Sequence, residues 1–351
     1  MRDDEPSGTN AREGVDAALP WQHATLRRLY ARRARWPHAM LLQGPEGIGK
    51  RNFAHALARA LLCEASRPSG EPCGTCPGCR YVAAGQHPDL RIVEPLDVDG
   101  DEIKRVEWIV VDRIRDLNAW AAITSHRGGA KVALIVPAER MNAAAANALL
   151  KTLEEPPPGT HFLLVSHQPG RLPATIASRC QRIAAPRPSA SDARAWLDAQ
   201  GVREADALLA QAGFAPLRAL ALADAAVQAE RRTFLDALAA PQALSPVALG
   251  ARIDALPREM RRDRLAAAID WLVAWCADLA RTRAGAQALA HPGRDAALRA
   301  LAASVAPPAL FRYHRRLLRE RTLLSHPLSP RLVAEALLID YRALFGATTQ
   351  D

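Results

Sequence analysis

The segment GPEGIGKR, residues 44–51, decides the fold of this chain because it is one residue short of a phosphate-binding loop. Such a loop requires Gly, four residues, Gly, Lys and then Ser or Thr, whose hydroxyl holds a magnesium ion. Gly44, Gly49 and Lys50 meet this pattern, but Arg51 stands in the hydroxyl position. A short apolar run at 39–43 precedes the loop and a helical pattern follows it. Strand, glycine loop and helix are the context in which a phosphate loop occurs.

Strand and helix patterns alternate along the first half of the chain. Short apolar runs predict further strands at 89–95, 130–137 and 160–166, and a short helix with a last strand within 172–185. Apolar residues at helical spacing predict helices at 103–120 and 139–155, and a basic helix at 22–35. This alternation predicts an α/β fold with a parallel sheet wrapped on both faces.

The pattern changes at Pro186 and Pro188, which mark a linker, and Ser189 or Ser191 is placed to cap the next helix. Only helical periodicity follows, with a second break at 238–246. We therefore expect three folded parts after a leader. They are an α/β domain at 21–185, a small helical lid domain at 186–240 and an all-helical domain at 241–351.

Composition limits the classes of protein that fit. The chain has 351 residues, a net charge of +9 and 49% apolar residues, enough for two or three domains. The polar stretch at 1–20 predicts a disordered leader and has no apolar segment typical of a signal peptide. No run reaches the ~18 apolar residues of a membrane span, so we expect a cytoplasmic protein. The basic charge permits contact with nucleic acid or an acidic partner without requiring it.

Four cysteines, Cys63, Cys73, Cys76 and Cys79, lie within CEASRPSGEPCGTCPGC. Two overlapping C-x-x-C steps place three thiolates on one tight knuckle, and Cys63 at the end of the preceding helix supplies a fourth. Four thiolates favour a closed, structural zinc site. An iron–sulfur cluster uses the same ligand type and stays open, whereas a cytoplasmic location argues against disulfides. Cys276 lies between apolar residues at helical spacing and is expected in the core.

Together these segments resemble the clamp-loader subunits of bacterial DNA polymerase III, members of the AAA+ superfamily. The resemblance rests on residues 44–50, the cysteine knuckle, 142–166 (NAAAANALLKTLEEPPPGTHFLLVS) and 172–180 (LPATIASRC). It is dense over 21–183 and weak in the last hundred residues, where 328–341 resembles the family's closing collar helix. The resemblance implies a P-loop AAA+ domain with an inserted zinc knuckle, a lid domain and a collar for oligomerisation.

ATP hydrolysis in this family needs an acidic pair after the third strand, one to organise magnesium and one to activate water. Val136 and Pro137 occupy those places here, and neither binds a metal or accepts a proton. Glu139 lies two residues further on, where the resemblance implies a surface or cap residue. With Arg51 in the loop, losses at two separate positions predict that the chain does not hydrolyse ATP.

The resemblance assigns residues to a vestigial nucleotide site. They are Gly44, Gly47, Gly49, Lys50 and Arg51 of the loop, Ser166 as the polar sensor and Arg218 as the second-sensor arginine. The loop amides and Lys50 permit weak, magnesium-free nucleotide binding. The alternatives are an empty structural loop, and for Arg218 a solvated helix end.

One residue is expected to act on a neighbouring chain. Arg179, with Ser178, belongs to the family's SRC signature, and the resemblance implies an arginine finger supplied in trans to an adjacent ATP site. The alternative is a surface arginine paired with a carboxylate. Cys180 is expected to pack against the core. Glu154 and Glu155 are expected to be structural, at a subunit interface.

The resemblance therefore implies the non-hydrolysing subunit of a hetero-pentameric clamp loader, with gamma/tau and delta subunits as partners. Through that complex it would meet the sliding clamp and primed DNA, as a component of a DNA-directed DNA polymerase, a nucleotidyltransferase. Two alternatives are an active ATPase of the gamma/tau type that uses Glu139, and a zinc-containing DNA-binding module. The arginines of the basic helix either contact DNA backbone or form a solvated face; they are Arg27, Arg28, Arg32, Arg33 and Arg35.

Overall fold

The computed structural model describes residues 17–99, 102–324 and 329–346, and the chain divides into two compact units at residues 196 and 197. Residues 1–16 of the expected leader lie outside the described residues. Its last residues belong to the first unit, because Leu19 is buried and its N–H donates to Gln22 Oε1 at 3.0 Å. Within the described ranges, no helix is both long and apolar enough to cross a membrane.

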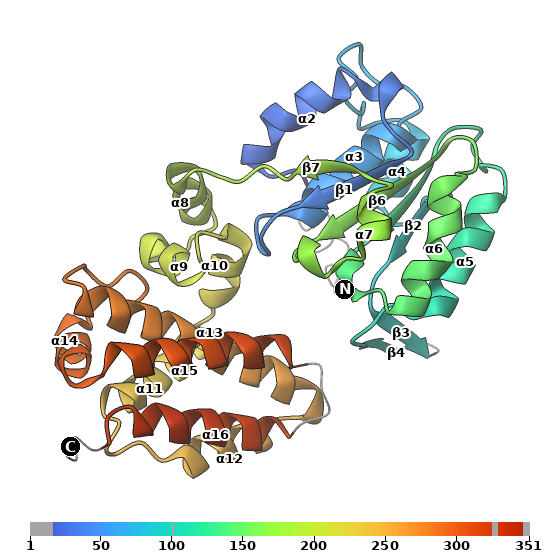
Figure 1. Cartoon of the computed structure of the whole chain (residues 1–351). Helices are drawn as coiled ribbons and strands as arrows, with labels where there is room; N and C mark the ends of the chain where they lie inside the picture. The colour runs from blue at the N-terminus through green and yellow to red at the C-terminus, as the bar shows by residue number, and fades with distance from the viewer. Residues whose placement is uncertain (1–16, 100–101, 325–328, 347–351) are drawn as a thin grey trace, which may run out of the picture. The chain divides into compact units, whose positions relative to one another are not determined.

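The first unit is built on a parallel sheet with the strand order β2-β5-β6-β1-β7 (Figure 1). These strands are β1 (Ala39–Gln43), β2 (Leu90–Val93), β5 (Lys131–Ile135), β6 (Thr160–Ser166) and β7 (Gln181–Ala184). Strands β1, β5 and β6 are almost wholly buried, which explains their continuous apolar sequences. The predicted strands at 89–95, 130–137 and 160–166 are confirmed, together with the last strand within 172–185.

Helices cover both faces of this sheet, as the alternating pattern predicted (Figure 1). Leu41 packs in one core with side chains of α5 and α6, whereas Met40 and Leu42 pack in another with α2 and α3. Successive residues of β1 therefore face opposite layers. The helices of this unit are α2 (His23–Tyr30), α3 (Lys50–Leu62), α4 (Pro77–Ala83), α5 (Val111–Ala122), α6 (Ala143–Glu154) and α7 (Ala174–Ala177).

Three predicted helices differ from the structure, and the one predicted at 139–155 begins only at Ala143, after a separate 3₁₀ turn, η3 (Ala138–Arg140). The first part of the helix predicted at 103–120 is wrong, because β3 (Leu96–Asp99) and β4 (Glu102–Arg105) form an antiparallel hairpin there and α5 begins only at Val111. Val98 pairs with Ile103 in that hairpin. The basic helix predicted at 22–35 ends at Tyr30, and a separate 3₁₀ turn, η2, covers Arg33–Arg35.

A linker follows β7, and the first helix after it, α8 (Ala190–Ala199), has the predicted cap, since Ser189 Oγ accepts from Asp192 N at 3.1 Å. The second unit is helical, as expected. Its helices are α9 (Ala205–Gln211), α10 (Pro216–Leu222), α11 (Ala225–Ala239), α12 (Pro246–Asp254), α13 (Arg258–Arg283), α14 (Asp295–Ser304), α15 (Pro307–Thr322) and α16 (Pro330–Ala343).

One apolar core holds the larger part of the second unit together. Trp275 is completely buried in it and donates through Nε1 to the hydroxyl of Tyr341 at 2.8 Å. That hydroxyl donates to the carbonyl of Leu238 at 2.8 Å, which joins α11 to the helices that follow it. Cys276 lies in the same core, as predicted. Because α11 shares this core with the C-terminal helices, the core marks no boundary near residue 240. The end of the lid domain at that residue stays a prediction.

A buried carboxylate fixes the loop between α13 and α14. Asp278 accepts hydrogen bonds from the N–H groups of Leu289, Ala290 and His291 at 2.8–2.9 Å. The Nδ1 of His291 lies 2.9 Å from the same carboxylate. Burial lowers the pKa of His291, against the opposing effect of Asp278. The pKa of Asp278 is also lowered, because the hydrogen bonds from His291 and from the backbone outweigh the opposing effect of burial.

Candidate functional site

The glycine loop joins β1 to α3 in the arrangement that its sequence predicted. Gly47 and Gly49 have φ values of +82° and +84°, which side chains rarely adopt, and Gly49 is the N-cap of α3. A Cβ at Gly49 would lie 2.2 Å from Leu19 Cδ1 and 2.8 Å from Gln22 Nε2. Glycine is therefore required here both by backbone conformation and by the N-terminal segment that packs on the loop.

Lys50, the first residue of α3, is buried and its ammonium turns back onto the loop. Its Nζ donates to the carbonyl of Pro45. Burial lowers the pKa of Lys50 to about 8, against the opposing effects of Glu139 and Glu46. The lysine that would contact phosphate is therefore satisfied within the protein, although it retains its place at the start of the helix.

Arg51 occupies the position of the magnesium-binding hydroxyl and forms an ion pair. Its Nη1 contacts Oε1 of Glu94, which directly follows β2. The two side chains are 38% and 21% exposed, so the pair is partly shielded from solvent. At this position the chain thus presents a guanidinium that a carboxylate already holds.

The end of β5 carries no acidic pair. Val136 is buried and Pro137 precedes a 3₁₀ turn that contains Glu139. Of the two expectations for Glu139, a surface residue or a cap, the surface position is wrong, because Glu139 is buried. Its Oε1 accepts from the backbone N–H groups of His167 and Gln168 at 2.9 and 3.0 Å, as a capping side chain does. The carboxylate is buried because it satisfies the backbone where the chain leaves β6.

The structure brings the predicted sensor position close to this carboxylate. Ser166 ends β6 and is completely buried, and its hydroxyl has no hydrogen-bond partner among the described residues. The next residue, His167, interacts electrostatically with both Lys50 and Glu139. Burial lowers the pKa of His167, and the charge of Lys50 lowers it further. Lys50, Glu139 and the end of β6 therefore form one polar cluster beside the glycine loop.

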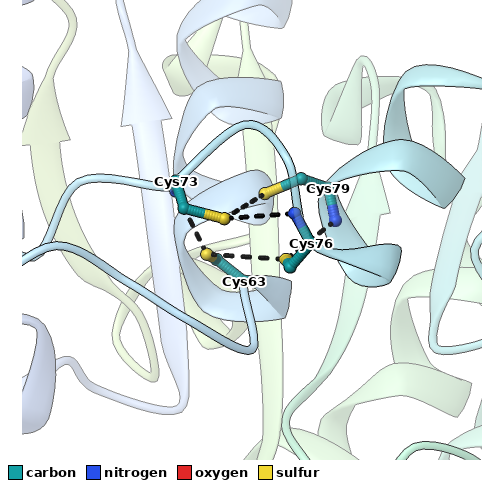
Figure 2. A group of neighbouring side chains, drawn as sticks. All are labelled: Cys63, Cys73, Cys76 and Cys79. Carbon is teal, nitrogen blue, oxygen red and sulfur yellow. Dashed lines mark hydrogen bonds between the residues drawn. The ribbon is translucent and has the colours of Figure 1, made fainter.

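The four predicted metal ligands lie together (Figure 2). All four sulfur atoms are within 4.8 Å of one another, with Cys63 and Cys76 at 3.9 Å and Cys73 and Cys79 at 4.0 Å. Backbone N–H groups also point at the sulfurs: Cys73 N donates to Cys63 Sγ at 3.2 Å and Cys76 N to Cys73 Sγ at 3.3 Å. Hydrogen bonds from Thr75 and Cys76 N–H lower the pKa of Cys73 to about 6. The pKa of Cys76 is also lowered, whereas burial raises the pKa of Cys63 and Cys79, so the hydrogen bonds favour the thiolate, the form that binds metal, at Cys73 and Cys76.

Arg179 follows α7 and pairs with a carboxylate. Such a pair was the alternative to the arginine finger in the sequence analysis. Its Nε donates to Oε1 of Glu154, at the end of α6, at 2.8 Å, and its Nη1 donates to the Thr175 carbonyl at 2.9 Å. The side chains of Arg179 and Glu154 are 33% and 48% exposed. Cys180 is buried, as predicted. The guanidinium is therefore held in one orientation at the surface of the unit, with Ser178 beside it.

Arg218 lies in the second unit, on α10, and pairs with Asp270 of α13 at 2.8 Å. Arg321 of α15 contacts the same carboxylate at 2.8 Å. The sequence did not predict the partners of Arg51 and Arg218, or which carboxylate pairs with Arg179. Each partner lies at least 25 residues away along the chain, so local spacing holds no signal for it.

Comparison with known proteins agrees with this architecture. A family profile described as "DNA polymerase III, delta subunit" matches residues 22–188. The delta prime subunit of DNA polymerase III from Pseudomonas aeruginosa is 44% identical over 219 residues, which cover 60% of this chain and 63% of that protein. The delta prime subunit from Escherichia coli is 38% identical, covering 63% and 65%. The one from Haemophilus influenzae is 34% identical over 245 residues, covering 69% and 70%.

The alignments thus span less than two thirds of the first two relatives and slightly more of the third. Among solved structures, a gamma subunit-related protein of DNA polymerase III from Thermotoga maritima covers 92% of this chain and 99% of its own, with 16% identity and a TM-score of 0.41. This TM-score is too low to support a family assignment, so the assignment rests on the relatives in sequence. The chain belongs to the family of DNA polymerase III delta prime subunits.

Proposed function

We propose that this chain is the non-hydrolysing delta prime subunit of a DNA polymerase III clamp loader, which places the sliding clamp on primed DNA. The observation that carries the proposal is the state of the magnesium positions. Arg51 stands in place of the hydroxyl and is held by Glu94, and Val136 and Pro137 stand in place of the acidic pair. Phosphoryl transfer needs a metal ion and an oriented water, and these residues supply a ligand for neither.

The glycine loop keeps a limited capacity for anions. Its backbone N–H groups and Lys50 remain at the start of α3, where a helix N-terminus favours negative charge. Binding of phosphate would require Lys50 to exchange its hydrogen bond with the Pro45 carbonyl. We therefore propose weak, magnesium-free nucleotide binding, with Ser166 and Arg218 as vestigial sensor positions.

Arg179 is the residue that we propose to act in catalysis, in trans. A guanidinium at the rim of this unit would stabilise the charge that develops on the phosphoryl group in a neighbouring ATPase subunit. The hydrogen bond of Arg179 to the Thr175 carbonyl supports this role because it holds the side chain at the surface, whereas the bond to Glu154 would be exchanged for the phosphoryl group. Ser178 would help by holding the guanidinium from the adjacent position.

The cysteine cluster fits zinc. Tetrahedral coordination at ~2.3 Å requires sulfur atoms about 3.8 Å apart. The cluster has Sγ–Sγ distances of 3.9 Å, between Cys63 and Cys76, and 4.0 Å, between Cys73 and Cys79, far longer than the ~2.05 Å of a disulfide. Since four cysteines fill a tetrahedral shell, the ion would hold the loop between α3 and α4 and leave no position for a substrate.

The two alternatives have less support. A general base must reach the attacking water, but Glu139 Oε1 is engaged by two backbone N–H groups and its Oε2 is buried. A stand-alone DNA-binding module would not need the AAA+ features that the family shares. We propose gamma/tau and delta subunits as partners through the helical second unit, and the cytoplasm as the place of action.

Reconstitution tests the proposed function. The chain is mixed with the gamma/tau and delta subunits of the same organism, and the complex is assayed for loading of the clamp on primed DNA. We expect co-elution with gamma/tau and a loading activity that depends on this chain. A chain that elutes alone, or a loader equally active without it, would contradict the proposal.

A further inference from the structure

A pocket lies at the edge of the sheet opposite to the glycine loop. The glycine loop follows the carboxyl end of β1, whereas this pocket is lined by residues at the amino ends of β2, β5 and β6, among them His87, Arg127 and His161. The strands are parallel, so their amino ends lie along one edge of the sheet. The pocket measures about 810 Å³, within the ~300–1,000 Å³ of pockets that bind small ligands.

The charged groups that line this pocket leave positive charge available. Three arginines, Arg33, Arg67 and Arg127, line it with two carboxylates, Glu64 and Asp89. Asp89 is completely buried and accepts two backbone N–H groups of the loop before β5 at 2.8 and 3.0 Å. Glu64 pairs with Arg127 Nε at 2.5 Å. Both carboxylates are therefore engaged, and neither Arg33 nor Arg67 pairs with a carboxylate that lines the pocket.

Arg33 is held in place without being neutralised. Its Nη2 donates to the carbonyls of Leu61 and Cys63 at 3.1 and 3.4 Å, and its Nη1 donates to the Ser66 hydroxyl. All of these acceptors are uncharged, and the described part of the chain gives Arg33 no carboxylate partner. Arg67 forms a long ion pair, 3.9 Å between Nη1 and Oε2 of Glu71, and its side chain is 63% exposed, so this pair is weak. A guanidinium oriented in advance binds an anion at a lower entropic cost.

Aromatic rings and an unsatisfied histidine nitrogen complete the pocket. Tyr30 and Trp36 line it and stack on each other, with centroids 6.3 Å apart and an angle of 29° between planes. His87 is buried, and its Nδ1 accepts from Asp89 N, which leaves the hydrogen of the neutral ring on Nε2. That Nε2 has no hydrogen-bond partner among the described residues. Aromatic rings beside arginines are the combination that binds a nucleobase and its phosphate.

We propose that this pocket binds a nucleotide unit, with its phosphate on Arg33 and Arg67 and its base beside Trp36. The unit comes either from a single DNA strand or from a free nucleotide, and the chemistry of recognition is the same. The proposal does not depend on the glycine loop or on the proposed function, since the pocket lies at the other edge of the sheet. It also gives a role to one arginine of the basic segment at 22–35.

The test uses the full chain in magnesium-free buffer without a chelator, so that the cysteine cluster is undisturbed. The probes are a fluorescent oligo(dT) of about 12 nucleotides, followed by anisotropy, and thymidine 5′-diphosphate, followed by calorimetry. The pocket variant is Arg33→Gln with Arg67→Gln. The matched control is Arg32→Gln with Arg35→Gln, two exposed arginines that do not line the pocket but carry the same charge.

We expect the pocket variant to weaken binding at least ~10-fold at about 0.1 M salt, and the control less than about 3-fold. The dependence of log affinity for the DNA strand on log salt should become shallower by ~0.7 for each phosphate that the variant no longer neutralises. An effect on the DNA strand alone identifies the strand as the source, and an effect on both probes identifies the nucleotide itself. Arg67→Gln alone, at an exposed position, should show part of the effect if the double variant folds poorly. Absence of binding by the unmodified chain, or equal losses in the two double variants, overturns the proposal.

Discussion

Replacing Arg179 by alanine should separate catalysis from stability. In this structure Arg179 holds an ion pair with Glu154, and the two side chains are 33% and 48% exposed. Ion pairs with such exposure contribute about 0–1 kcal/mol, so Arg179→Ala should lower the free energy of unfolding by no more than about 1 kcal/mol. By the same figure, releasing Arg179 from Glu154 to reach a neighbouring ATP site would cost at most about a factor of five in rate. An arginine finger contributes ~10³–10⁵ to the rate, so the catalytic loss should far exceed both effects.

The assay is single-turnover phosphate release in the reconstituted loader with saturating clamp and primed DNA. With Arg179→Ala, hydrolysis at the ATP site next to this chain should slow ~10³-fold or more, while the complex still assembles. Glu154→Gln frees the guanidinium and should keep the rate within about fivefold of the unmodified loader. Arg171→Ala removes an exposed arginine of the same unit and serves as the matched control. Unchanged hydrolysis in an assembled Arg179→Ala loader would show that Arg179 is not the finger.

Three further outcomes follow from buried groups and from the cysteine cluster. Cys76→Ser should lower the zinc content from about one ion per chain, and trypsin should then cut after Arg80, because Arg80 and Tyr81 are exposed and α4, which carries them and Cys79, is no longer held by the ion; a metal-free chain that stays protected from trypsin would refute the zinc assignment. Asp278→Ala should destabilise the protein by about 3–5 kcal/mol in urea unfolding, because it leaves two buried N–H groups and the buried imidazole of His291 without their acceptor. A loss of stability below about 1 kcal/mol would mean that water replaces the carboxylate. Acidification should also lower stability, because the folded pKa values of both His291 and Asp278 are below their unfolded values. The unfolded chain then binds more protons, so the melting temperature should begin to fall as the pH drops below ~6.5, where His291 titrates in the unfolded chain, and fall further below ~4, where Asp278 does. An unchanged melting temperature between about pH 7.5 and 5.5 would contradict the lowered pKa of His291.

The central strands β1, β5 and β6 could be predicted because they are almost wholly buried and therefore read as continuous apolar runs. The hairpin at 96–105 could not, because Ile103, Val106 and Ile109 also fit a helical period. Its strand character depends on the pairing of Val98 with Ile103, a contact between two segments. A single apolar pattern of this length is compatible with both structures until the pairing is known.

The candidate sites likewise include residues that the local sequence could predict and contacts that it could not. The cysteine cluster was predictable because all its ligands lie within one short segment. Glu139 was misplaced at the surface because a lone carboxylate is normally solvated, and its burial follows from two N–H groups 28 and 29 residues away. The Arg51–Glu94 pair likewise spans 43 residues. Such partners are set by how the strand ends converge, which no local pattern encodes.

The most direct test of the central claim is magnesium-dependent phosphate release from ATP by the purified chain alone. Because Arg51, Val136 and Pro137 replace the groups that organise the metal and the water, we predict a rate indistinguishable from a buffer blank. Release that rises with protein concentration and stops when magnesium is withheld would show that this chain hydrolyses ATP, and would contradict the account of it as a non-hydrolysing subunit.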